Sequence, residues 1–134
     1  MAINNYSNDL NAVNVNGREI KDWGATDPPI SEEELAPLST LIKGNGGNAV
    51  SFDTVSPGRR VTLNINPGSD DAFYLQGLAN SKATITYGRA QVSSGEVVAG
   101  SEGKIVTKGT VGRGGPGITD FQIVIEFNIW SATA

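Results

Sequence analysis

The chain has 134 residues, with 10 Lys and Arg against 14 Asp and Glu, and it contains neither cysteine nor histidine. This composition excludes thiol nucleophiles, imidazole acid–base catalysis and the usual structural zinc sites. The net charge of −4 comes with basic residues that are scattered singly, so no basic stripe is available to grip phosphates.

The length predicts a single domain over residues 1–134 with its own core. The start of the chain, Met1 to Asp9, has neither a basic segment nor an apolar run, so we expect no Sec export. No stretch approaches the roughly 18 apolar residues of a membrane span. The sequence is compatible with synthesis in the cytoplasm.

The first predicted elements form a β-hairpin. Asn16-Gly17 lies between short alternating segments, and a type I′ turn requires positive φ at both central residues. We expect strands over 9–15 and 18–23. From Gly24 to Gly47 the pattern dissolves, which predicts an extended loop of roughly 24 residues.

Several apolar side chains of this loop region need a surface to pack against. Two interpretations are open: the loop folds back on its own domain, or it is an arm that docks on a neighbouring subunit. The candidate inter-subunit arm residues are Trp23, Ile30, Leu35, Leu38, Leu41 and Ile42.

Two strands over 49–53 and 59–66 are then predicted to pair as a second hairpin. Ser69 follows Pro67-Gly68 and is predicted to cap a helix of about ten residues that covers a flank of the sheet. The acids Asp70 and Asp71 suit the positive end of its dipole, a structural role rather than that of a catalytic pair.

The remaining chain reads as strands. We expect one over 82–92 and one or two over 96–99 and 105–111, interrupted by Gly100 to Gly103. In the last strand, 121–130, alternation places one apolar stripe on a single face, namely Phe121, Ile123, Ile125, Phe127 and Ile129. The expected fold is mainly β: an antiparallel barrel or sandwich of roughly seven strands, one flanking α-helix and the long extended loop.

The sequence offers no reactive constellation. The glycine-rich segment 112–117 lacks the strand, helix and terminal Lys of a phosphate-binding loop. The acidic run Glu32–Glu34 lacks calcium-loop spacing and predicts a solvated stretch. Trp23 and Trp130 are expected to pack rather than to serve as stacking platforms. We therefore predict no catalytic residue, no metal and no cofactor.

The order of elements, together with particular segments, resembles the tail tube proteins of contractile-tailed bacteriophages. The segments are Val13-Asn14-Val15-Asn16-Gly17-Arg18-Glu19-Ile20, Gly47-Asn48-Ala49-Val50-Ser51-Phe52, Val61-Thr62-Leu63-Asn64-Ile65 through Asp70-Asp71 to Leu75 and Leu78, and the aromatic last strand. The inner tubes of type VI secretion and of bacteriocins are similar in fold.

The resemblance implies a non-enzymatic structural protein of a virion tail, made in the host cytoplasm. Its partners would be copies of itself in stacked hexameric rings, the tail sheath and the baseplate. DNA would pass through the bore during ejection without specific binding.

Exposed strand edges independently favour assembly, because unpaired edge groups are satisfied when copies pair. One strand face would then line the bore with polar, weakly charged side chains. The candidate lumen-facing residues are Thr62, Asn64, Thr84, Thr86, Gln122, Glu126 and Asn128.

Three alternatives remain. A baseplate or tube-end tail protein would share the fold without extending indefinitely. A carbohydrate-binding β-sandwich would use Trp23, Trp130 and Tyr74 as stacking groups. A small glycosidase would need two facing carboxylates, which no segment predicts.

Overall fold

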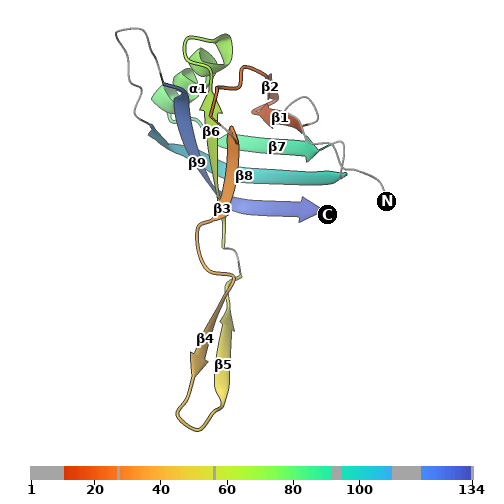
Figure 1. The fold of residues 1–134 in the computed structure, drawn as a ribbon, viewed down its shortest axis with the longest axis vertical. Helices are drawn as coiled ribbons and strands as arrows, with labels where there is room; N and C mark the ends of the chain where they lie inside the picture. The colour runs from red at the N-terminus through yellow and green to blue at the C-terminus, as the bar shows by residue number, and fades with distance from the viewer. Residues whose placement is uncertain (1–10, 27, 56, 92–94, 110–118, 134) are drawn as a thin grey trace.

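The computed structural model describes residues 11–26, 28–55, 57–91, 95–109 and 119–133. Seven antiparallel strands form a curled half-barrel in the order β2-β1-β7-β8-β9-β6-β3, and β4 and β5 form a separate hairpin (Figure 1). The strands are β1 Asn11–Val15, β2 Arg18–Ile20, β3 Ile30–Glu34, β4 Ser39–Lys43, β5 Ala49–Asp53, β6 Arg59–Ile65, β7 Ile85–Gln91, β8 Glu96–Lys108 and β9 Phe121–Thr133; the helix is α1 Asp70–Ser81. The predicted mainly β fold with one helix is confirmed.

The core fills the inner side of the curled sheet. It takes alternate residues of β1, β6, β7 and β9, and α1 adds Ala72 and Leu75. Phe121, Ile123, Ile125 and Phe127 are buried, so the predicted stripe of the last strand is confirmed over these four positions. The first hairpin is also confirmed: Asn16 and Gly17 both have positive φ, as the type I′ turn requires.

The fifth residue of the stripe, Ile129, is 48% exposed because the alternation of inward-facing and outward-facing residues in β8 and β9 changes phase at this point. We call this change of phase, between the pairs described next, the strand reversal. Gly103 pairs with Phe127 and Gly100 pairs with Trp130, and an added Cβ at either glycine would press on the Phe127 ring. Both pairs therefore face the core. In a regular strand, residues three positions apart would lie on opposite faces. Glu102, between the glycines, has a left-handed φ of 54°. Figure 1 shows β9 running beside β6 and then turning away from it.

The expected long loop is wrong, because two five-residue strands lie within it. β3 pairs with β6, and β4 pairs with β5. The expected pairing of 49–53 with 59–66 is therefore also wrong: β6 lies between β3 and β9. The carboxylates of Glu32–Glu34 concealed the alternation of β3, and the glycine-rich turn at 44–47 closes a hairpin with β4 rather than ending a loop.

Other predictions differ in their boundaries. The segment that contains Gly100–Gly103 is one continuous strand, β8, and the strand expected over 82–92 begins at Ile85. The helix expected after Ser69 is confirmed, and the Ser69 hydroxyl accepts a hydrogen bond from the Ala72 N–H at 3.2 Å. The export signal considered at Met1 to Asp9 and the glycine-rich segment 112–117 lie outside the described residues.

Asp71 ties the start of α1 to the end of β2. Its buried carboxylate accepts hydrogen bonds from the Lys21 N–H at 2.7 Å, the Asp22 N–H at 3.0 Å and Arg18 Nε at 2.9 Å. Burial alone would raise the pKa of Asp71, but these three donors outweigh it and lower the pKa. The structural role predicted for this acid agrees with these contacts.

Replacing Gly103 by Ala is expected to destabilise the domain by about 1–3 kcal/mol, since the new methyl group would overlap the Phe127 ring. Gly77→Ala is the matched control, because its Cβ would meet nothing within 4 Å on an exposed helical position. That variant should gain about 0.5–1 kcal/mol. Urea unfolding measures both, and equal effects of the two substitutions would contradict this account of the strand reversal.

Candidate assembly surfaces

A cluster of charged side chains joins β3, which is the edge strand next to β6, to β7 across the half-barrel. Arg89 of β7 donates from Nε to Glu32 Oε2 and from Nη2 to Glu32 Oε1, both at 2.9 Å. Its Nη2 also lies 2.6 Å from Glu96 Oε1, and the Tyr87 hydroxyl donates to Glu32 Oε2 at 3.0 Å. We call Glu32, Tyr87, Arg89 and Glu96 the closure cluster, because it holds the curl of the sheet shut.

The closure cluster is largely withdrawn from water, with side-chain exposures of 11% for Arg89 and 14% for Glu32. Burial alone would lower the pKa of Arg89, but its hydrogen bonds to Glu32 and Glu96 raise that pKa above the usual value. Burial, reinforced by the charge of Glu32, raises the pKa of Tyr87 well above its usual value. At neutral pH Arg89 is therefore charged and Tyr87 protonated.

The acidic run of β3 pairs with arginines rather than with solvent. Glu33 lies 2.9 Å from Arg60, and Glu34 lies 3.4 Å from Arg59. The β3–β6 register places these two pairs directly opposite each other. The expected solvated stretch is therefore wrong for Glu32, because strand alternation turns it inward beside Ile30.

The aromatic residues considered as stacking platforms pack within the domain. The Trp130 ring stacks on Tyr87 at 5.6 Å and lies 5.8 Å from Phe127. Trp23 packs against the core and forms a bridge with Ile65, while Tyr74 lies under the Arg18 guanidinium. Each of these rings therefore has a packing partner within its own chain.

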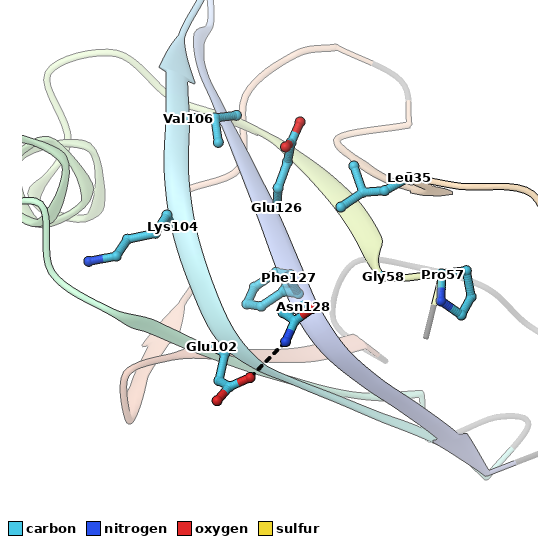
Figure 2. Close-up of a pocket in the computed structure, with 9 residues that line it drawn as sticks. All are labelled: Leu35, Pro57, Gly58, Glu102, Lys104, Val106, Glu126, Phe127 and Asn128. Carbon is cyan, nitrogen blue, oxygen red and sulfur yellow. Dashed lines mark hydrogen bonds between the residues drawn. The ribbon is translucent and has the colours of Figure 1, made fainter. Parts of the chain in front are cut away.

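A hollow of about 290 Å³ lies on the outer side of β8 and β9, beside Leu35. Figure 2 shows the side chains that line it. Its polar groups already have partners. Glu102 accepts a hydrogen bond from Asn128 Nδ2 at 2.9 Å, Glu126 accepts from Arg60, and Lys104 donates to the Lys82 carbonyl. In the described part of the chain, no three acidic side chains gather as they would around a metal ion.

The predicted arm residues divide into two groups. Trp23 and Ile30 pack against the core of their own chain, so the structure places them in the domain. Leu35 is at the margin of exposure, whereas Leu38, Leu41 and Ile42 are 58%, 69% and 56% exposed. The last two lie on β4, in a hairpin that projects away from the half-barrel (Figure 1).

Sequence reasoning missed two members of this surface, Val50 and Phe52. Both are more than half exposed and lie on β5, which the sequence pattern joined to the sheet. The signal that could have found them is the Gly44-Asn45-Gly46-Gly47 turn between two five-residue strands. We call β4, β5 and their turn the projecting hairpin.

The candidate lumen-facing residues do not form one surface. Thr62, Gln122 and Glu126 share the outer face of β6 and β9. Asn128 lies at the strand reversal, Thr84 precedes β7, and the Thr86 hydroxyl contacts Asn16 near the first turn. Asn64 is buried and lies against the Pro29 carbonyl, so in this chain it does not face solvent.

Three solved structures share this fold over nearly the whole chain. A chain from the sheath/tube terminator of PVC, an extracellular contractile injection system, in its extended state aligns with a TM-score of 0.67 and 12% identity, covering 97% of both chains. A chain from the extended PVC sheath–tube complex gives 0.63 and 13%, covering 92% of this chain and 88% of the other. One from the tube-terminating cap of the anti-feeding prophage gives 0.56 and 10%, covering 99% and 94%.

These likenesses establish the fold: this half-barrel occurs in chains of contractile injection systems. Neither a protein-family profile nor a curated protein sequence matches the chain. The one described helix is too short and too polar to cross a membrane.

Replacing Arg89 by Met should destabilise the domain by about 3–5 kcal/mol, because the buried Glu32 carboxylate would lose its charged partner. In a Glu32→Gln background the same change should cost less, which a double-mutant cycle measures. Arg60→Met is the control, since its more exposed pairs are worth about 0–1 kcal/mol. Strict additivity of the Arg89 and Glu32 changes would refute the closure cluster.

Stability should fall as pH rises above about 10, where the Tyr87 phenol ionises in the unfolded chain but is held protonated in the fold. The raised pKa stabilises the fold fully below that pH, and the contribution is lost at higher pH. Phenolate absorbance followed with circular dichroism should show Tyr87 ionising only as the chain unfolds. The Tyr87→Phe variant should lack this late step; its persistence there would contradict the assignment.

Proposed function

We propose that this chain is a non-enzymatic structural subunit of a contractile injection particle, which polymerises as part of the inner tube or at the tube's end. The observation that carries the proposal is the projecting hairpin, attached to a fold shared end to end with chains from such particles. The proposed partners are copies of this chain and the sheath and baseplate around the tube.

The projecting hairpin has few contacts that would stabilise it in a monomer, because β4 and β5 pair only with each other among the named strands. A lone two-stranded ribbon is marginal in water. This hairpin exposes several large apolar side chains to water, and their exposure contributes no stability to a monomer. These residues are Leu41, Ile42, Val50 and Phe52, and the exposed Leu38 and Val55 flank the hairpin on either side. Docking on another subunit would stabilise the hairpin and remove this apolar area from water.

Open strand edges support the same conclusion. β9 pairs with β6 as far as Phe127, and from Ile129 to Thr133 β8 is the named strand that pairs with it in the described residues. β3 and β2 are the two ends of the sheet order. Each edge offers backbone N–H and C=O groups to a strand of another copy.

The finer proposal is a stack of hexameric rings whose bore conducts DNA from a phage capsid. Thr62, Gln122 and Glu126 would line this bore, because they share an outward-facing surface on adjacent strands. The net negative charge supports free passage, since multiple phosphate contacts would add salt-dependent affinity. The alternative role is a tube-end or baseplate subunit, which would form a single ring without extending.

Negative-stain electron microscopy of the concentrated protein tests the proposal. A tube-body subunit should form rings and tubes, and a tube-end subunit should form discrete rings. Monomers alone at every concentration would contradict both roles.

Leu38→Ser combined with Ile42→Ser should prevent assembly while the domain stays folded, since both side chains are exposed in the monomer. Phe73→Ser is the matched control: Phe73 is 64% exposed but lies on α1. Sedimentation velocity measures assembly, and thermal unfolding reports the fold. Unfolding of the double variant would mean that the hairpin stabilises its own domain instead.

A further inference from the structure

The projecting hairpin has two chemically different faces. Directly opposed residues of an antiparallel pair lie on the same face. Thr40 opposes Phe52 and Ile42 opposes Val50, which gives one uncharged and mainly apolar face. The other face carries Asp53 and Lys43, and Leu41 opposes Ser51 there. The unpartnered surface is therefore the face of Ile42, Val50 and Phe52.

A second uncharged surface lies on the outer side of the half-barrel, beyond the strand reversal. The β7–β8–β9 register places Ala90 beside Val97, and Gly88, Ala99 and Ser131 in the next row. Ile129, turned outward by the reversal, extends this surface. Val97 and Ile129 are about half exposed, at 51% and 48%. We call these six residues the uncharged face.

The outer surface formed by β3, β6 and the first half of β9 is unsuitable for an apolar partner. On the other side of the reversal, Arg60 pairs with Glu33 and Glu126 across β3, β6 and β9. An apolar hairpin placed there would desolvate three charges. The uncharged face carries none, so it matches the Phe52 face of the hairpin in polarity.

We propose that the Phe52 face of the projecting hairpin docks on the uncharged face of a second copy of this chain. The proposal rests on the proposed function, because a ring or tube requires a contact between two different surfaces, whereas a hairpin-to-hairpin contact closes at two copies. The five-residue strands are only about 17 Å long, so one contact is smaller than a standard interface. Assembly follows because every copy both gives and receives a hairpin.

Two charge substitutions test the docking. Phe52→Lys and Ala99→Glu should each raise the concentration needed for assembly by roughly tenfold or more, since each buries an unpaired charge. Both positions are exposed, and unchanged thermal unfolding would verify the fold. Leu41→Lys, on the opposite hairpin face, is the matched control and should assemble as the unmodified chain does.

Mixing the two variants provides the decisive measurement. In an alternating assembly, each hairpin with the Phe52→Lys change would meet a face with the Ala99→Glu change, and the new charges would pair. Each unmodified hairpin would meet an unmodified face, so equimolar mixtures should assemble again in sedimentation velocity and electron microscopy. If Phe52→Lys blocks assembly while Ala99→Glu does not, or if mixing fails to restore assembly, the docking surface is wrong although the proposed function stands. An unmodified chain that never assembles would overturn both.

Discussion

The ion pair between Glu32 and Arg89 is the contact on which the shape of this domain depends. β8, β9 and β6 separate β7 from β3 in the sheet, so these two strands meet only because the sheet curls back on itself. Withdrawing two charges from water is costly, and the bidentate geometry with Tyr87 and Glu96 as further partners offsets that cost. Apolar burial is not directional and is compatible with many curvatures of the sheet. The hydrogen bonds between Glu32 and Arg89 form only when the curvature brings β3 and β7 to one particular separation.

The strand reversal at Gly100–Gly103 is the second constraint, and it works together with the first. The two glycines make room for Phe127 and Trp130 on the inner side, and the Trp130 ring then covers Tyr87 of the closure cluster. The same reversal divides the outer face into a charged half and an uncharged half. One local irregularity thus completes the core and leaves an uncharged surface on the outer side of the sheet.

The sequence predicted what depends on local periodicity. The stripe from Phe121 to Phe127, the Asn16-Gly17 turn and the Ser69-capped helix all follow from contacts within a few residues, and all are present. It failed where a strand's character comes from a distant partner. β3 carries three consecutive acids that look solvated until Arg59, Arg60 and Arg89 are beside them. The exposure of Ile129 likewise follows from a reversal shared by two strands, which period-2 alternation does not indicate.

The projecting hairpin lies outside the network of contacts that folds the domain, since β4 and β5 pair only with each other among the named strands. Mutations on it should therefore be nearly neutral for folding. Residues near Ile42 and Phe52 can therefore change in the course of evolution without disturbing the residues that maintain the half-barrel. The surface of the hairpin and the stability of the half-barrel are in this sense separately adjustable.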